Sequence, residues 1–522
     1  MNILIVHPWK RILHNQYKEY FFMPERAVQI ATFLEDEDYN VDFIDFGRTD
    51  LDENVNSDID NPKGVRGTGE SLTHYGISEE ETQEWLDENL QKYDKVIIDS
   101  LMPYFRQGVE QVIEACKSDD IEHVLYGEWV GLRPQDFEQS YAVTGNWELG
   151  CKKFLEDELE RGVNWVGFQD VGMDDLPVPD WNRWVDMEDY PEPERADYRA
   201  TRGCPENCDF CHVFGNWDRT FKFKTADKIK DDLEFLIDEG FDKIQLRDDN
   251  FCAHVGNATE VFEWLGENYP DVEILQVEGM EMKTAANSPE LIEAIGECNY
   301  HSVRIGFETA VEGQFDKNKL EWWEKAYEKF VEVGFKPDQI ITWVLAGHPK
   351  LSREDEIRTA LYLSQYGVRI IPSSYREVPG TELYNEETPY IQGQKYPQDD
   401  ENVDRVKKMY RCVSMWNQWG VDVFRDDIPN AFYSLDFVDN VAFVGDQAVI
   451  EGTVSGWSRG EALEFGFWIY GVKDGQYGVQ TKKDTKEEKV YERMLSHDKF
   501  GNMVNDVLYE EGLVNARKGG LL

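Results

Sequence analysis

The sequence has few basic residues and no long apolar run. Its 522 residues include 54 lysines and arginines against 104 aspartates and glutamates, which gives a formal net charge of −50. With no lysine- or arginine-rich stripe to contact phosphates, this charge disfavours a nucleic acid partner. No apolar run approaches the ~20 residues of a membrane-spanning helix, and the apolar start at 3–6 predicts a strand, not a signal peptide. We therefore expect a cytoplasmic protein with no membrane span whose substrate is a small molecule.

Cysteine is scarce and unevenly placed. Of the eight cysteines, five stand singly along the chain, at Cys116, Cys151, Cys252, Cys298 and Cys412. Single cysteines without a secretory signal argue against a disulfide framework and are typical of small buried apolar residues. The chain also has no second C-x2-C pair and no H-x3-H pair, which structural zinc sites usually use.

The remaining three cysteines lie close together. Cys204, Cys208 and Cys211 occur in the run Thr-Arg-Gly-Cys-Pro-Glu-Asn-Cys-Asp-Phe-Cys at 201–211. Three thiolates on one tight loop can hold three irons of a cubane cluster and leave the fourth iron open to a substrate or cofactor. His212 could complete a four-ligand zinc site, but the missing second ligand pair disfavours zinc. The spacing therefore predicts a [4Fe-4S] cluster with an open iron.

Apolar strand-like segments alternate with helix-like ones upstream of this loop. The strand-like segments are 3–6, 41–45, 95–99 and 123–126, and helices are predicted at 24–34 and around 107–116. This is the pattern of a doubly wound α/β domain, and a polar loop at 47–76, a lid or substrate contact by hypothesis, interrupts it. The segment lacks the G-x-G-x-x-G fingerprint, so a nicotinamide or flavin dinucleotide is disfavoured.

The same alternation continues downstream. Helix-like runs with apolar residues at three- and four-residue steps occupy 226–239, 258–268, 289–298, 322–333 and 353–366. Strand and helix in repetition predict parallel β/α units, whose cofactors bind at the carboxyl ends of the strands. We therefore expect the three cysteines to meet the residues that follow these strands.

The C-x3-C-x2-C spacing resembles the signature of the radical S-adenosylmethionine (SAM) superfamily. Two later segments resemble that superfamily in the same order: 243–251 is similar to the Asp-Asp-x-Phe stretch, and 303–309 is similar to the x-Ile-Gly-x-Glu-Ser strand end. The resemblance implies that Asp248 and Asp249 bind the methionine end of SAM and that Glu308 lies near the ribose and methionine. From the residues alone, a solvated turn remains the alternative for the two aspartates.

Two further segments complete the resemblance. The turn at 344–349 is similar to the family's Gly-x-Pro turn, and 376–384 is similar to its Pro-Gly-Thr-x-Leu-Tyr segment. The resemblance implies that Gly347 and Arg376 also bind the cofactor and that Phe210 shields the cluster and covers the adenine. The alternatives are an unusual backbone angle for Gly347 and ordinary core packing for Phe210.

The N-terminal part resembles the cobalamin-binding-type domain that precedes one branch of this superfamily, and 174–181 resembles that branch's Leu-Pro-x-Pro-Asp linker. No Asp-x-His-x-x-Gly motif is present, so no histidine is assigned below the cobalt. The resemblance implies an α/β chain with a doubly wound, Rossmann-like cobalamin-binding-type domain at 1–165. A linker at 166–195, a partial (β/α)6 radical SAM barrel at 196–395 and a small α+β C-terminal region at 396–522 follow. That last region either selects the substrate at the barrel mouth or is a packing appendage.

The resemblance also implies a reaction. A cluster on the three cysteines would cleave SAM to a 5′-deoxyadenosyl radical, and cobalamin would then support methylation of an unactivated carbon of a small molecule. Flavodoxin or ferredoxin would supply the electron. Two alternatives stay open, a cobalamin-independent radical rearrangement, cyclisation or oxidation, and a non-catalytic iron–sulfur or zinc sensor.

Overall fold

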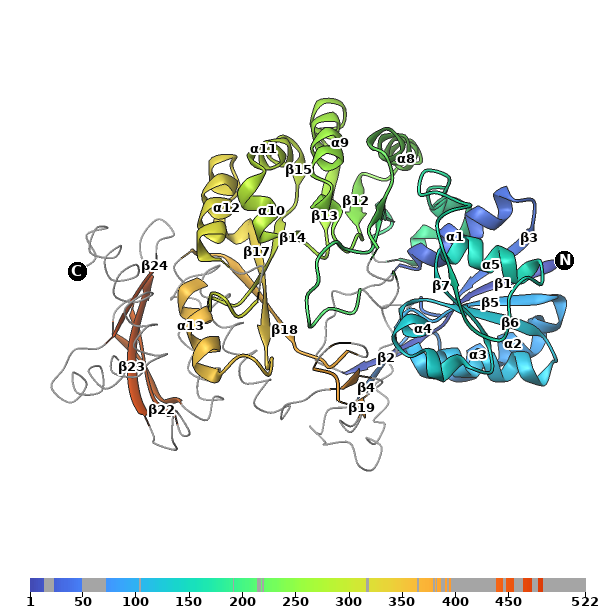
Figure 1. The fold of residues 1–522 in the computed structure, drawn as a ribbon, viewed down its shortest axis with the longest axis horizontal. Helices are drawn as coiled ribbons and strands as arrows, with labels where there is room; N and C mark the ends of the chain where they lie inside the picture. The colour runs from blue at the N-terminus through green and yellow to red at the C-terminus, as the bar shows by residue number, and fades with distance from the viewer. Residues whose placement is uncertain are drawn as a thin grey trace. The chain divides into compact units, whose positions relative to one another are not determined.

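The computed structural model describes most of the chain up to residue 385 and six strands beyond it (Figure 1). The described residues are 1–13, 23–48, 72–102, 105–190, 192–213, 217, 220–315, 319–363, 366–378, 381, 383–385 and the strands between 390 and 481. The chain divides into two compact units. The first consists of Met1–Glu278, Glu297–Asn299 and Arg376–Tyr396, and the second of Gly279–Gly296, Tyr300–Tyr375 and Pro397–Leu522.

The first unit begins with a six-stranded parallel sheet in the order β3-β1-β5-β6-β7-β8. The strands are β1 (Asn2–His7), β3 (Asn40–Asp45), β5 (Lys95–Asp99), β6 (Glu122–Tyr126), β7 (Tyr141–Gly145) and β8 (Gly162–Val166). The chain runs from β1 to β3 on one side and then crosses to β5 on the other. The doubly wound fold is therefore confirmed, with its switch point between β1 and β5.

Alternating side chains of β1 build the core on both faces of this sheet. Ile3 and Ile5 join one buried apolar cluster, and Leu4 and Val6 join the other. Figure 1 shows α1 and α5 on one face and α2 and α3 on the opposite face. The helices are α1 (Glu25–Asp36), α2 (Glu79–Asn89), α3 (Arg106–Ser118), α4 (Glu128–Leu132) and α5 (Trp147–Leu155).

Four strands of this region were not predicted from the sequence, and neither were the helices α4 and α5. The strands are β7, β8 and the antiparallel pair formed by β2 (Lys10–Leu13) and β4 (Leu72–Tyr75). The sequence predicts a loop at 7–23 after the first strand, and β2 occupies part of that segment. The part of the interrupting loop at 49–71 lies outside the described residues.

The first unit continues with a four-stranded sheet in the order β15-β13-β12-β9. Its strands are β9 (Arg195–Tyr198), β12 (Lys243–Leu246), β13 (Glu273–Gln276) and β15 (Asn299–Tyr300). Helix α8 (Ala226–Asp238) connects β9 to β12, and α9 (Val255–Asn268) connects β12 to β13, with parallel pairing across β9, β12 and β13. The cysteine loop lies between the two short strands β10 (Thr201–Arg202) and β11 (Lys222–Phe223), which pair antiparallel.

The second unit contains a parallel sheet in the order β14-β16-β17-β18. Its strands are β14 (Met280–Glu281), β16 (Val303–Glu308), β17 (Ile340–Ala346) and β18 (Arg369–Ser374), and its helices are α10 (Met282–Asn287), α11 (Pro289–Glu297), α12 (Leu320–Glu332) and α13 (Arg353–Leu363). The strands expected in one open barrel thus form two separately bonded sheets, and the described part of the chain contains no closed barrel.

The C-terminal strands form an antiparallel sheet in the order β21-β22-β23-β24. They are β21 (Val438–Val444), β22 (Gln447–Val454), β23 (Leu463–Gly471) and β24 (Tyr477–Thr481), preceded by the hairpin of β19 (Tyr390–Ile391) and β20 (Gln394–Lys395). The sequence also predicts helices at 403–420 and 486–495, which lie outside the described residues, and the division of the chain into four segments stays a prediction. None of the helices described is long and apolar enough to cross a bilayer.

Candidate functional site

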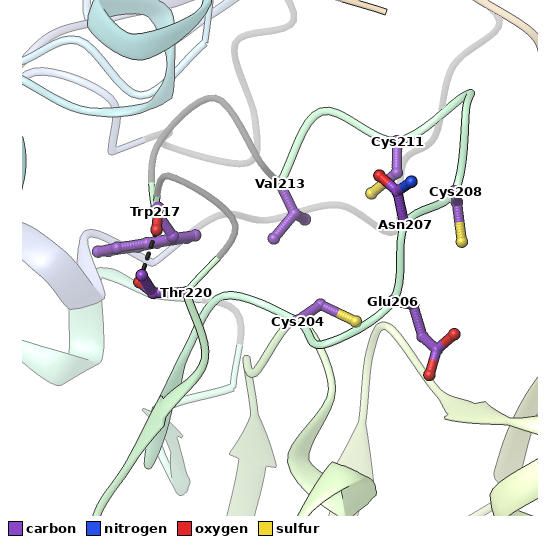
Figure 2. A pocket seen from close by; sticks show the side chains of 8 residues that line it. All are labelled: Cys204, Glu206, Asn207, Cys208, Cys211, Val213, Trp217 and Thr220. Atoms are coloured by element: carbon purple, nitrogen blue, oxygen red, sulfur yellow. Dashed lines mark hydrogen bonds between the residues drawn. The ribbon is translucent and has the colours of Figure 1, made fainter.

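The three clustered cysteines line one pocket on the loop between β10 and β11 (Figure 2). The residues around it are Cys204, Glu206, Asn207, Cys208, Cys211, Val213, Trp217 and Thr220. Figure 2 shows Cys204 on one side of the pocket and Cys208 and Cys211 across from it. The backbone N–H of Cys211 donates to the carbonyl of Cys208 at 3.2 Å, which makes a tight turn between them.

A glycine closes the loop at its base. Gly203 has a φ of +80°, and a Cβ at this position would lie 2.1 Å from the carbonyl oxygen of Thr220. Glycine adopts this angle without strain, and only a residue without a Cβ allows so close an approach of the two ends of the loop. The glycine before the first cysteine is therefore required by the shape of the loop.

The arrangement of the thiols suits a cluster better than a single ion. Among the described residues, no three His, Cys, Asp or Glu side chains meet closely enough to hold one metal ion. In a cubane cluster each cysteine binds a different iron, so three sulfurs spread around a pocket fit its donor set. His212, the fourth ligand of the zinc alternative, directs Nε2 to Glu128 at 3.3 Å instead.

Burial raises the pKa of the Cys204 and Cys211 thiols in the metal-free protein. Iron binds the thiolate, so binding at these positions releases the thiol protons.

Asp248 anchors the start of the cysteine loop. Its Oδ1 accepts hydrogen bonds from the backbone N–H of Thr201 at 2.5 Å and of Ala200 at 2.9 Å. The carboxylate is completely buried just beyond the end of β12, and burial raises the pKa of Asp248 to about 6. The resemblance implied that Asp248 binds the methionine end of SAM. In the structure one of its carboxylate oxygens accepts hydrogen bonds from the backbone at the start of the loop.

The next two side chains extend this contact along the loop. Asp249 Oδ2 accepts a hydrogen bond from the backbone N–H of Gly203 at 3.2 Å, and Asn250 Nδ2 donates to Cys204 Sγ at 3.6 Å. Consecutive residues after β12 therefore contact consecutive parts of the stem that leads to the first cysteine. Asn250 was not singled out from the sequence, where it occupies the variable place in Asp-Asp-x-Phe.

The stem is also tied to the six-stranded sheet by a buried arginine. Arg202 Nη2 donates to Gln29 Oε1 at 2.6 Å and to Glu148 Oε1 at 2.8 Å. Its guanidinium lies 5.6 Å from the ring centre of Trp147 and 5.7 Å from that of Trp217. Both Arg202 and Glu148 are 1% exposed, so each charge depends on the other for compensation.

A second chain of charges reaches the end of the loop. The Glu128 carboxylate, at the start of α4, contacts His212 at 3.3 Å and Arg26 at 2.5 Å, and Arg26 lies 4.7 Å from the centre of the Trp147 ring. Burial opposes ionisation of Glu128, but Arg26 and His212 together hold its pKa below the ordinary value. Arg199, which precedes the loop, contacts Glu25 of α1 at 3.4 Å. Through Arg199 before the cysteines and His212 after them, the loop is bound to the helices of the six-stranded sheet.

Polar residues also gather at the switch point of the six-stranded sheet, where doubly wound folds bind their ligands. His7 Nδ1 and Asp99 Oδ2 lie 2.9 Å apart across β1 and β5, and burial lowers the pKa of the neighbouring Lys10 to about 7. A Cβ on Gly47 would lie 3.1 Å from His7 Nε2. His7 is therefore bonded to Asp99 through Nδ1, and the backbone of Gly47 passes close to its ring.

Glu308 and Gly347 belong to the second unit. Glu308 ends β16 with a φ of +62°, whereas the other described non-glycine residues with positive φ are aspartates that follow helix ends. Such strain in a long side chain at a strand end is typical of functional sites. Gly347 has a φ of +78° and its N–H donates to Glu356 at 2.7 Å, so a turn accounts for this glycine.

The structure brings the three cysteines together with Asp248 and Asp249. Phe210 is half-buried within the same loop. Arg376 belongs to the first unit and comes shortly after β18 of the second unit in the chain. Gly380 lies outside the described residues. The cofactor-binding roles of these residues stay predictions.

Residues 198–363 match the sequence model of the Radical SAM superfamily. The chain is 22% identical over 264 residues to an uncharacterized methyltransferase from Synechocystis, which covers 47% of each chain. It is 29% identical over 115 residues to the hopanoid C-2 methylase of Rhodopseudomonas palustris, which covers 20% of this chain and 21% of that protein. The chain thus matches about half the length, or less, of these curated relatives.

Two solved structures of the radical S-adenosylmethionine methyltransferase TsrM from Kitasatospora setae share the fold. The structure with cobalamin and a [4Fe-4S] cluster bound gives a TM-score of 0.55 at 15% identity and covers 73% of this chain and 76% of that chain. The structure with tryptophan substrate and the SAM analogue aza-SAM gives 0.54 at 16% identity, and covers 73% and 74%.

The family match covers the region that carries the cysteine loop. The matched segment begins at the end of β9, includes the cysteine loop and extends to the end of α13. Residues 198–363 are therefore similar to the radical SAM superfamily, and the fold of the chain is similar to that of TsrM.

Proposed function

We propose that the protein is a radical SAM enzyme that holds a [4Fe-4S] cluster on Cys204, Cys208 and Cys211 and methylates an unactivated carbon of a small molecule with cobalamin. The observation that carries the proposal is the pocket lined by these three thiols on a loop fixed from two sides. Cysteine sulfur is the preferred ligand of iron–sulfur clusters, and three ligands leave one iron open.

The residues around the pocket fit such a cluster. Asn250 donates to Cys204 Sγ, and hydrogen bonds to cluster sulfurs are a common feature of these sites. Asn250 Oδ1 is buried without a partner among the described residues, which suits a hydrogen-bond donor on a bound cofactor. When bound, the cluster supplies the electron that opens the sulfonium bond of SAM. The loop residues hold its ligands and limit the access of water.

Two kinds of observation support cobalamin. The six-stranded sheet gathers His7, Asp45 and Asp99 at the strand ends on both sides of its switch point. Among the similar proteins, TsrM was solved with cobalamin and a cluster bound, and the hopanoid C-2 methylase is a methylating enzyme by name. Cobalamin would bind near these strand ends, and no histidine is assigned as its ligand, because the Asp-x-His-x-x-Gly motif is absent.

The partners follow from this chemistry. A small molecule is the proposed substrate, and a flavodoxin or ferredoxin is the proposed electron donor, because the cluster must be reduced before each cleavage of SAM. A reducing compartment such as the cytoplasm suits an oxygen-sensitive cluster.

Anaerobic reconstitution with iron, sulfide and hydroxocobalamin tests the proposal. We expect about four irons and about one cobalt per chain after desalting, and formation of 5′-deoxyadenosine from SAM under reducing conditions. The matched control replaces Cys204, Cys208 and Cys211 by alanine.

Deoxyadenosine formed by that control would refute the cluster assignment. Iron without cobalt would refute the cobalamin part and favour a cobalamin-independent rearrangement, cyclisation or oxidation. Bound iron with no cleavage of SAM would instead favour the non-catalytic sensor.

A further inference from the structure

Asn250 directs its side chain at a cysteine instead of capping the helix that it precedes. It stands before the short 3-10 helix η5 (Phe251–Ala253), a position where asparagine commonly accepts a hydrogen bond from the backbone of the first turn. No such bond forms, and Nδ2 points at Cys204 Sγ at 3.6 Å. The side chain is thus committed to the loop that lies 46 residues earlier in the sequence.

The surroundings hold this side chain in place. Asn250 is 5% exposed, and the next two residues, Phe251 and Cys252, are buried at 3% and 0%. On its other side, Asp248 and Asp249 are bonded to the stem of the cysteine loop. Asn250 therefore has little freedom to turn away, and its N–H group stays beside the sulfur.

A hydrogen-bond donor beside this sulfur changes the reduction potential of a cluster bound to it. A thiolate sulfur that binds iron has lone pairs and no proton, so it can only accept a hydrogen bond. An N–H group beside it stabilises negative charge, and reduction adds one negative charge to the cluster. The hydrogen bond therefore favours the reduced form and raises the reduction potential.

We propose that Asn250 is a positioning residue that sets the reduction potential of the cluster through its hydrogen bond to Cys204. The inference rests on the proposed function, because it requires a cluster on this loop. Backbone N–H groups at Glu206 and Val213 also lie near the sulfurs of Cys204 and Cys211, but they remain in any side-chain variant. The contribution of Asn250 can therefore be removed separately.

Redox titration of the reconstituted protein, monitored by the electron paramagnetic resonance of the reduced cluster, tests this role. In Asn250→Ala we expect full iron content and a midpoint potential more negative than in the wild type. Loss of one hydrogen bond of this kind changes the one-electron equilibrium by about five- to tenfold, which corresponds to about 40–60 mV. Asn250→Asp, which keeps the shape and replaces the donor with a carboxylate, should shift the potential further in the same direction.

Asn268→Asp is the matched control, because it makes the same charge change at an exposed asparagine that donates only to the Trp264 carbonyl. Its potential should equal that of the wild type. An unchanged potential in both Asn250 variants would overturn the inference while leaving the cluster in place. A wild-type protein that assembles no cluster would instead refute the proposed function.

A measurement on the wild type covers the case in which neither variant assembles. A hydrogen bond to sulfur shifts the Fe–S stretching bands in the resonance Raman spectrum when its proton is exchanged for deuterium. If Asn250 donates to the cluster ligand, the Fe–S bands of the wild type should move on transfer to deuterium oxide. Absence of any such shift would overturn the inference without any substitution.

Discussion

Asp248 Oδ1 lies 2.5 Å from the backbone nitrogen of Thr201 and accepts its hydrogen bond inside the protein. Two residues past the end of β12, a buried carboxylate thus fixes the short strand that leads into the cysteine loop. The other oxygen, Oδ2, is buried and has no partner among the described residues. The anion is therefore only half compensated, and this has a measurable effect on stability.

The stability of the metal-free protein should depend on pH through Asp248. Burial raises its pKa to about 6 from 3.8, so the native state binds more protons than the unfolded state between these values. Its contribution to stability is fully present below pH 3.8 and is lost as the pH rises through about 6, by up to about 3 kcal/mol.

Asp248→Asn keeps an acceptor oxygen and removes the charge. Chemical denaturation at several pH values should show that the free energy of unfolding of Asp248→Asn increases relative to that of the wild type as the pH rises from about 4 to 6. Asp248→Ala is the control, because it leaves two buried N–H groups unbonded and should be less stable throughout this range. A difference between Asp248→Asn and the wild type that does not vary with pH would contradict the assignment.

Glu308 should show a conflict between stability and binding. Its positive φ costs a side chain about 1–2 kcal/mol and costs glycine almost nothing. Glu308→Gly and Glu308→Ala both remove the carboxylate, but only the glycine variant relieves the strain. We expect the free energy of unfolding of Glu308→Gly to be about 1 kcal/mol higher than that of Glu308→Ala. The affinity for SAM should be reduced in both variants. Equal stability of the two variants would show that the backbone angle carries no strain.

Arg202 and Glu148 should behave as a coupled pair. Replacing either one by methionine leaves a buried charge without its partner, and each single variant should lose about 3–5 kcal/mol of unfolding free energy. The double methionine variant should lose less than the sum of the single losses, as a double-mutant cycle measures. The exposed pair Arg106 and Glu110 offers a control whose coupling should stay below about 1 kcal/mol. Additive losses at Arg202 and Glu148 would rule out the coupling.

Replacing single cysteines should separate ligands from core residues. Alanine at Cys204, Cys208 or Cys211 should abolish the cluster absorbance and most of the bound iron, because each supplies one of three ligands. Alanine at the buried Cys116 or Cys252 should leave the iron content unchanged and lower stability by about 1 kcal/mol through the lost packing. Iron retained in a Cys208 variant, or lost in the Cys116 variant, would overturn the ligand assignment.

The sequence predicts the strands of the first sheet well where they are continuous apolar runs. The segment at 3–6 and the segment at 95–99 are of this kind, since parallel strands covered on both faces bury every side chain. The strands β7 and β8, Tyr-Ala-Val-Thr-Gly and Gly-Val-Asn-Trp-Val, mix polar residues and glycine into a short span and give no such signal.

The site is predictable in part for a similar reason. The spacing of the three cysteines is local, so it is visible in the chain. The bonds from Asn250 to Cys204 and from Arg202 to Glu148 join residues that are 46 and 54 positions apart. No local periodicity encodes such contacts, because they depend on which strands become neighbours. The sequence therefore predicts the ligands, and the structure adds the residues that hold them.

The stem at 199–204 is already ordered by Asp248, Asp249, Asn250 and Glu148 when the chain folds. Fixing a backbone costs about 1–2 kcal/mol for each residue, and here this loss of entropy occurs on folding and not on arrival of the metal. In the proposed enzyme, iron would therefore meet Cys204 as a sulfur whose position folding has already fixed.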